Sequence, residues 1–253
     1  MNYNVKPILM SAPMVLATLR EIKAPGTGKT QTRRIIKQQP ATRICNVLDI
    51  KPPEQNEDGE WGQWETTWSN WTLESRGEPL DEIWHPMRCP YGKPGDLLYV
   101  RETWSGEYWL SDTKPSDRLL MQNGRRLVSL IPETWYWADG SPSSGDWEKP
   151  RPGIHMPRWA SRLTLEITDI RVERLQSISE EDAIAEGVLR DTDGWRDYIM
   201  PCTQCCATAY DSYKTLWTSI NGPESWTANP WVWAVSSRPH LINVDDFIKA
   251  RAA

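Results

Sequence analysis

The sequence predicts an α+β fold arranged around a small β-barrel. Segments with the composition of strands occur near both ends and in the middle of the chain, and short segments with helix start and stop signals alternate with them. The 253 residues are enough to bury a substantial core. We therefore expect residues 1–253 to form a single domain in which short helices flank the barrel.

The N-terminal segment is expected to contain a strand and then a helix. Residues 5–10 are largely apolar, Ser11 is a suitable N-cap, and residues 13–22 have the apolar periodicity of a helix. Proline and glycine then require a loop at residues 25–28. The basic segment at residues 28–37 is therefore predicted to be irregular, with backbone N–H groups that are free to meet a ligand.

More strands and helices are expected further along the chain. The clearest pattern is the alternation of apolar and polar residues in RLTLEITDIRVERL, which is typical of a half-buried strand. SEEDAIAEG has acidic residues in its first turn and ends at a glycine, as a short helix does. In chain order, the expected elements are a turn at residues 89–96, strands at 97–104 and 162–175, helices at 179–187 and 211–220, and a final strand at 230–235.

Two tryptophan-rich segments interrupt this order. Residues 51–88 are polar and acidic, and residues 105–153 are rich in Gly, Ser, Pro and Trp. We interpret both segments as insertions on the surface. The chain has 16 Trp against a single Phe, and tryptophan suits either a core that is short of Phe or the stacking of nucleobases.

The overall charge limits the classes of ligand. A net charge of -5 and a pI of about 5.4 argue against a protein that coats nucleic acid, but they allow a local basic pocket. The sequence has no run of about 18 apolar residues and no signal-peptide pattern, so no membrane is expected. The five cysteines do not suggest a disulfide framework, which fits reduced thiols in a cytoplasmic protein.

The basic segment GKTQTRR, at residues 28–34, is the strongest candidate for a functional centre. Residues 24–30, which lead into this segment, look like an ATP-binding P-loop, but that motif needs a glycine where this chain has Lys23. The motif also needs a strand before the loop, where a helix is expected here. We therefore exclude a P-loop, and a solvated basic loop remains the alternative to a functional site.

Lysine and threonine in this segment can act together. Two nearby arginines, Arg33 and Arg34, disfavour the charged form of Lys29, so we expect the pKa of Lys29 to be lowered. A neutral lysine amine can take the proton of a threonine hydroxyl and so activate it as a nucleophile. Thr32, three positions after Lys29, is the candidate nucleophile.

These motifs together resemble the ASCH family of PUA-like β-barrel domains. The similarity is greatest to the larger ASCH-type proteins of tailed phages and prophages. It rests on stretches that cover roughly half of the chain, namely KPILMSAPMV, KTQTRR, CPYGKPGDLLYVRETW, HMPRWASRLTLEITDIRVERLQSISEEDAIAEG and LWTSINGPESWTANPWVW. The two tryptophan-rich segments are not covered.

This resemblance implies a cleft that binds a nucleobase, a nucleoside or nucleic acid, either RNA or DNA, in the cytoplasm of a bacterial host cell. It also implies hydrolysis of the amide of N4-acetylcytidine-type substrates, without a required cofactor. Lys29 would deprotonate Thr32, Thr32 would attack the acetyl carbonyl, and Glu186 would orient the lysine or handle the proton of the leaving amine. The candidate ligand-binding residues are Thr30, Arg33 and Arg34, the arginines for a phosphate or the developing oxyanion.

A second group of cations precedes the strand expected at residues 162–175. In the expected fold this stretch could line the cleft, with Trp159 stacking on a base and Arg158 contacting a phosphate. A structural role in closing the barrel is the alternative.

Cysteine spacing raises the question of a zinc site. Cys202 and Cys205 form a C-x-x-C pair, which is half of a zinc site by spacing. Cys206, Cys89 and His85 could supply further ligands if the fold brings them close. Free thiols are the alternative interpretation.

Three functions follow from these observations. The first is a binding module for RNA or DNA that retains amidohydrolase activity, and the second is a hydrolase of free acylated nucleosides. The third is a phage–host interaction protein that uses the barrel only as a scaffold, because a fold does not by itself fix a function.

Overall fold

A computed structural model describes most of the chain. The described residues are 3–37, 39, 45–51, 64–70, 83–120, 133–201 and 205–252, of which 45–51, 64–70, 83–87 and 119–120 are described by their backbone alone. Strands and helices are mixed along the chain, which confirms the α+β class. None of the helices in these ranges is long and apolar enough to cross a membrane.

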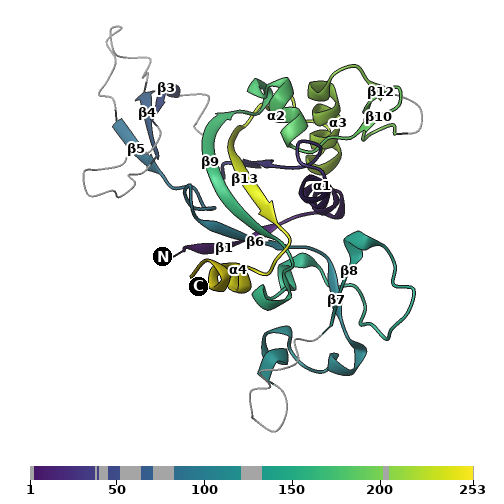
Figure 1. The fold of residues 1–253 in the computed structure, drawn as a ribbon. Coiled ribbons are helices and arrows are strands. Elements are labelled where there is room, and N and C mark those ends of the chain that lie inside the picture. The colour runs from purple at the N-terminus through teal and green to yellow at the C-terminus, as the bar shows by residue number, and fades with distance from the viewer. Residues whose placement is uncertain are drawn as a thin grey trace, which may run out of the picture.

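A five-stranded sheet is the centre of the fold (Figure 1). One edge pair, β1 and β6, is parallel, and every other neighbouring pair is antiparallel. The strands, in their order across the sheet, are β1 (Val5–Leu9), β6 (Leu97–Arg101), β9 (Thr164–Arg174), β13 (Trp231–His240) and β2 (Gln31–Ile35). The sheet therefore unites segments from the beginning, the middle and the end of the chain.

The long strands β9 and β13 form the curved middle of this sheet (Figure 1). In β9, Leu165 and Ile167 are buried and Glu166 between them is less so, which is the alternation read from the sequence. The register between the two strands shifts between Ser236 and Ser237. An irregularity of this kind bends a strand and increases its local twist.

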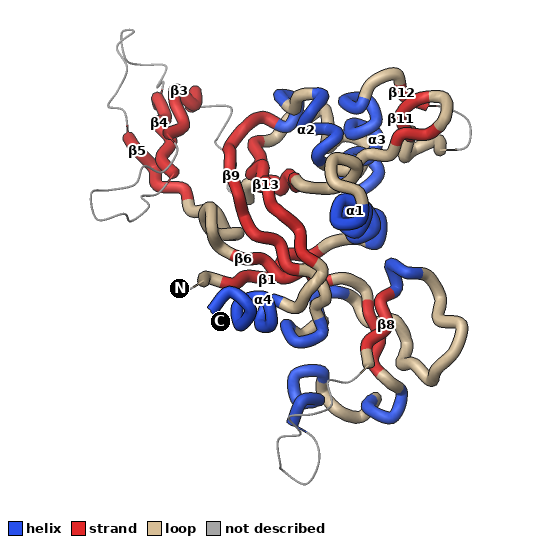
Figure 2. Tube along the Cα trace, in the orientation of Figure 1, coloured by secondary structure: helices blue, strands red, loops and turns tan. Residues whose placement is uncertain are grey.

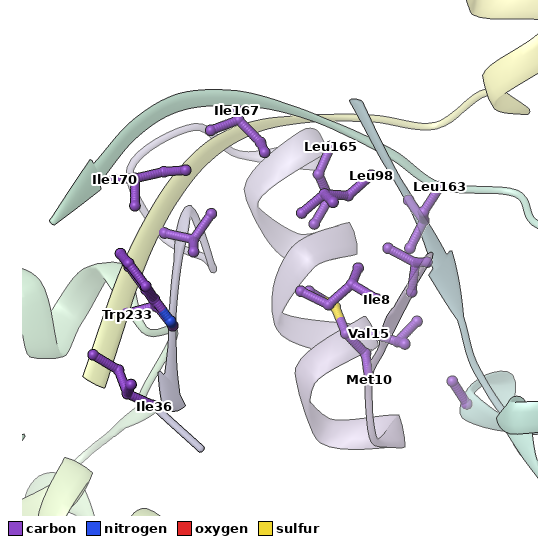
Figure 3. Packing of buried hydrophobic residues seen from close by; sticks show 13 residues of the cluster. Ile8, Met10, Val15, Ile36, Leu98, Leu163, Leu165, Ile167, Ile170 and Trp233 are labelled. Atoms are coloured by element: carbon purple, nitrogen blue, oxygen red, sulfur yellow. The ribbon is translucent and has the colours of Figure 1, made fainter. Parts of the chain in front are cut away.

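Helix α1 (Ala12–Lys23) lies in the curve of the sheet (Figure 3). Pro13 is in its first turn, where the missing N–H would have no helical partner in any case. Figure 3 shows apolar side chains of the sheet pointing toward this helix, whose Val15 is fully buried. The buried residues of this cluster are Ile8, Met10, Val15, Ile36, Leu98, Val100, Ala138, Leu163, Leu165, Ile167, Ile170, Trp233 and Val235. Removal of their apolar surface from water is the main force that holds α1 in the sheet.

The closed barrel expected from the sequence is not found among the described residues. β1 and β2 are the two edges of the sheet, and no strand pairing joins them. The physical reason is that α1 connects these two strands and fills the space beside them with its own side chains. Instead of strand pairing, the Arg34 guanidinium of β2 donates a hydrogen bond at 2.5 Å to the Leu9 carbonyl oxygen of β1.

Two further helices, α2 (Glu180–Ala185) and α3 (Ala209–Asn221), lie beside the sheet (Figure 2). They contribute to a second apolar core. α2 begins after Ser179, whose hydroxyl accepts a hydrogen bond from the Asp182 N–H, and Gly187 follows it at φ 86°. α3 packs against α2. The buried residues of this core are Leu175, Ile178, Ala183, Val188, Ala209, Tyr213, Trp217, Trp226 and Val232.

A final helix, α4 (Val244–Ala252), is not predicted by the sequence pattern. Its buried residues are Val244 and Phe247, which pack with Leu97 of β6. Two buried positions are too few to give a clear helical periodicity.

The two tryptophan-rich segments contribute to small sheets of their own rather than to the central sheet. The first small sheet contains β3 (Cys45–Lys51), β4 (Trp64–Asn70) and β5 (Ile83–Met87), and the second contains β7 (Trp104–Gly106) and β8 (Thr134–Tyr136). The strand expected at residues 97–104 is therefore divided between β6 and β7.

A third small sheet precedes α3, and short 3-10 helices occur in the connections. The sheet contains β10 (Arg190–Asp191), β11 (Gly194–Arg196) and β12 (Cys205–Cys206). The 3-10 helices are η1 (Tyr108–Leu110), η2 (Pro115–Leu120), η3 (Trp137–Asp139), η4 (Gly153–His155), η5 (Arg158–Ala160) and η6 (Leu175–Ser177).

Candidate functional site

The basic segment is buried and largely regular rather than an irregular surface loop. Its central part is the strand β2, paired with β13, which corrects the sequence prediction of an irregular backbone. Lys29 and Arg33 are each 3% exposed, and Thr32 is 2% exposed. The alternative of a solvated basic loop is therefore wrong, and the burial of these cations requires partners.

The loop before the segment uses its N–H groups internally. The Glu21 carboxylate of α1 accepts hydrogen bonds from the backbone N–H groups of Gly26, at 3.0 Å, and Gly28, at 2.8 Å. A helix precedes this loop and a strand follows it, which is the reverse of the P-loop order. Both observations confirm that the loop is not a P-loop.

Lys29 and Glu186 form a buried ion pair. The Lys29 ammonium nitrogen lies 2.5 Å from Glu186 Oε2 and also donates a hydrogen bond to the Glu186 carbonyl oxygen at 3.0 Å. Glu186 caps the C-terminus of α2, so this helix positions the carboxylate. The structure therefore brings two of the three catalytic candidates into direct contact.

The pKa of Lys29 is lowered, as the sequence predicts, but the main cause is different. Burial has the largest effect, because the charged ammonium loses its hydration. Glu186 opposes this effect by raising the pKa, and the charges of Arg34 and Arg33 lower it further. The neighbouring arginines are therefore a secondary cause.

This lowered pKa makes the stability of the protein depend on pH. The folded protein holds the Lys29 proton less tightly than the unfolded chain does, so the unfolded state binds more protons at pH values below the ordinary lysine pKa of 10.5. We expect the free energy of unfolding of the wild type to rise, relative to that of a Lys29→Met variant, as the pH increases from about 7 to about 10. Urea denaturation of both proteins across this range measures the difference. A difference that stays constant or falls would contradict the expectation.

Arg33 is the centre of an ion-pair network. Its guanidinium contacts Asp182 at 2.7 Å and Glu186 at 3.4 Å, and it makes a short contact with Glu173. Gln31 Oε1 accepts a further hydrogen bond from Arg33 Nη1 at 2.5 Å. Burial alone would lower the pKa of Arg33, but the carboxylates raise it. Both terminal nitrogens of Arg33 are therefore engaged within the protein.

The two threonines of the segment have different environments. The Thr32 side-chain oxygen is buried and has no hydrogen-bond partner among the described residues. Thr30 is half-buried, and its backbone N–H donates to the Ala185 carbonyl oxygen at 2.8 Å. The backbone of Thr30 therefore ties this segment to α2, whereas the Thr32 hydroxyl has unused hydrogen-bonding capacity.

A pocket of about 220 Å³ lies against this network, between β2 and α3. Glu186, Arg33 and Arg34 supply charged groups to its lining. Of the three catalytic candidates, Glu186 lines the pocket, whereas Lys29 and Thr32 do not. The apolar and aromatic part of the lining comes from Met14, Ile35, Tyr91, Tyr213, Leu216, Trp217 and Ile220.

The α3 side of this pocket is not predicted by the sequence analysis. Tyr213, Leu216, Trp217 and Ile220 recur at helical spacing and so share one face of α3. That spacing is the signal in the sequence that could have indicated a pocket wall. An apolar face of this kind also suits a core, however, and Tyr213 and Trp217 do belong to a core. Tyr91 lies in a turn and gives no signal of its own.

Arg158 and Trp159 make their contacts elsewhere in the fold. Arg158 pairs with Asp245 of α4 at 2.5 Å. The Trp159 indole N–H donates to the Pro115 carbonyl oxygen at 3.0 Å, and its ring meets that of Trp104 edge-on at 6.0 Å. Neither residue lines the pocket. These contacts favour a structural role for the pair over ligand binding, although that role is not the closing of a barrel, because the described strands form none.

The candidate zinc ligands do not form a metal site within the described residues. Cys89 packs against the core of the central sheet, whereas Cys205 and Cys206 lie on β12. Cys202 lies outside the described residues, and the side chain of His85 is not described. Across the described part of the chain, no group of three or more His, Cys, Asp or Glu side chains could hold a metal ion.

Comparisons with protein-family models, with curated proteins and with solved structures give no match. The pocket and the ion-pair network beside it are therefore the features from which a function can be inferred.

Proposed function

We propose that the chain binds a nucleobase, either in a nucleoside or as part of RNA or DNA, in the pocket between β2 and α3. The composition of the pocket carries this proposal, because aromatic side chains lie there beside a buried carboxylate. Tyr91 and Trp217 offer ring surfaces for stacking, and the Glu186 carboxylate can accept hydrogen bonds from N–H groups on the edge of a base.

The size of the pocket favours a single base over a larger ligand. Its volume of about 220 Å³ is below the range of about 300–1,000 Å³ that is typical of sites for drug-sized molecules. A base can enter a space of this size while the sugar stays at the mouth. The same arrangement allows one base of a longer RNA or DNA strand to be bound.

We also propose that the central sheet is a PUA-like barrel of the ASCH family, left open between β1 and β2. The curvature of the sheet around α1 supports this proposal (Figure 1). The hydrogen bond from Arg34 to the Leu9 carbonyl oxygen supports it as well, because it links the two edges that a barrel would pair.

Hydrolysis of the amide bond of an N4-acylated base is a second candidate function. The lowered pKa of Lys29 and the unpartnered hydroxyl of Thr32 favour it. The Thr32 oxygen would bond to the acyl carbon while its proton passes to Lys29, the amine would leave with that proton, and water would then release the acid from Thr32. Because neither side chain lines the pocket, the acyl group would have to reach past Glu186. Binding is therefore the better supported of the two functions.

Isothermal titration calorimetry with the common ribonucleosides and N4-acetylcytidine tests the binding proposal. We expect at least one of them to bind the wild type, and a Tyr91→Ala variant to bind it about tenfold more weakly or worse, because one base–aromatic stack is lost. Trp109→Ala is the matched control, since Trp109 is 68% exposed and does not line the pocket. Binding that is absent, or unchanged by Tyr91→Ala, would falsify the proposal.

An assay of acetate release from N4-acetylcytidine separates the two candidate functions. If the wild type binds this nucleoside and releases no acetate, hydrolysis fails and binding stands. If acetate is released, loss of release with retained binding in Lys29→Met assigns the lysine to the chemistry. If the protein is inert in both assays, the scaffold function is the one that remains.

A further inference from the structure

We infer that the ligand of this pocket carries a phosphate group that pairs with Arg34. The inference rests on the proposed nucleobase site and names its ligand as a nucleotide rather than a neutral nucleoside. It follows from the charge of one lining residue. Arg34 is a half-buried cation that makes no ion pair with any described residue.

The contacts of Arg34 do not neutralise its charge. Its Nη2 donates to the Leu9 carbonyl oxygen at 2.5 Å, and its Nε has no partner among the described residues. A carbonyl oxygen carries only a partial negative charge. A guanidinium that is partly removed from water without a counter-ion raises the free energy of the folded state, and an oxyanion at the same place would lower it.

The other cations around the pocket are compensated by carboxylates. Lys29 pairs with Glu186 at 2.5 Å, and Arg33 and Arg171 share Asp182 at 2.7 Å and 2.6 Å. The one pocket cation left without a carboxylate among the described residues therefore stands out against its neighbours. Because the neighbouring cations are paired, the charge of Arg34 is a local excess of positive charge in the wall of the pocket.

The surroundings of Arg34 suit a phosphate. Tyr91 and Tyr213 line the pocket with it, and burial raises the pKa of both phenols while the Arg34 charge opposes the rise. Phosphate oxygens accept hydrogen bonds from guanidinium and hydroxyl groups alike. The lining therefore offers hydrogen-bond donors from Arg34 and a carboxylate acceptor from Glu186, and a nucleotide carries groups that pair with both, namely its phosphate and the N–H groups of its base.

Calorimetry with a nucleoside and with its 5′- and 3′-monophosphates tests the inference. We expect one of the monophosphates to bind the wild type about tenfold more tightly than the nucleoside, or better, because a hydrogen bond to a charged group is formed. The advantage should shrink at higher ionic strength. In an Arg34→Met variant the advantage should be lost, so that the nucleoside and the monophosphate bind with affinities within about twofold of each other.

Two further variants control this experiment. Arg34→Lys keeps the charge and should keep part of the advantage. Arg196→Met removes a cation that pairs with Asp191 away from the pocket and should keep all of it. Thermal melting shows whether Arg34→Met is folded, and Arg34→Lys carries the comparison if it is not.

The outcomes separate this inference from the proposed function. Equal affinity of the wild type for nucleoside and monophosphates, or an advantage that survives in Arg34→Met, overturns the inference and leaves the nucleobase site intact. Tighter binding of a nucleoside that carries a carboxylate instead of the phosphate also overturns it. If no nucleoside binds, but inorganic phosphate binds the wild type and not Arg34→Met, the anion site stands and the nucleobase proposal fails.

Discussion

A variant in which Arg33 is replaced by methionine is expected to lose about 3–5 kcal/mol of its free energy of unfolding. The guanidinium of Arg33 contacts three carboxylates, those of Glu173, Asp182 and Glu186, and the last of these is 3% exposed. Methionine has a similar length but no charge, so it removes the cation that all three acids share and that offsets part of their desolvation. Urea denaturation at neutral pH measures the loss.

The matched control is Arg171→Met, which removes a cation from the same network. Arg171 contacts the Asp182 carboxylate at 2.6 Å, but its side chain is 43% exposed, so water compensates for much of the change. We expect this variant to lose less than about 1 kcal/mol. If Arg33→Met were equally mild, Arg33 would not be a structural cation, and the prediction that it binds the ligand would be favoured instead.

The parts of the fold that the sequence predicts well are those decided by neighbouring residues. α2 has its N-cap at Ser179 and a glycine with positive φ at Gly187, and both signals lie within the helix and its ends. β9 was predicted from its own alternation of apolar and polar residues. Strand β2 was missed because its charged side chains read as a loop. The carboxylates that allow Arg33 to be buried lie 140 to 153 residues later in the chain.

For the same reason, the candidate site could be predicted only in part. The resemblance to the ASCH family pointed to Lys29 and Glu186, which the structure places in contact. It could not separate Arg33 from Arg34, which are identical in type and adjacent in sequence. Both side chains line the pocket, but the sequence alone does not show which groups from distant segments surround each of them. Only the folded chain shows that one is enclosed by carboxylates and that the other has none among the described residues.

The glycine that begins the basic segment is expected to be as important for stability as its charges. A Gly28→Ala variant should lose about 3 kcal/mol or more, because a Cβ there would lie 2.2 Å from the Glu21 nitrogen and 2.3 Å from the Ala17 carbonyl oxygen. Both are backbone atoms of α1 and cannot turn away as a side chain does. The next residue, Lys29, donates its backbone N–H to the same Ala17 oxygen at 3.0 Å, so a displaced loop would also shift the lysine relative to Glu186. Urea denaturation measures the loss of stability.

Gly26→Ala in the same loop separates this steric effect from backbone strain. Gly26 has φ +84°, which costs an L residue about 1–2 kcal/mol, but a Cβ there would meet nothing within 4 Å. A larger loss in Gly28→Ala than in Gly26→Ala therefore measures the close approach of the loop to α1. If Gly28 served instead to bring the backbone close to a ligand, as the glycines of a P-loop do, its alanine variant would keep nearly the stability of the wild type and lose only binding. The internal use of the loop's N–H groups by Glu21 favours the first outcome.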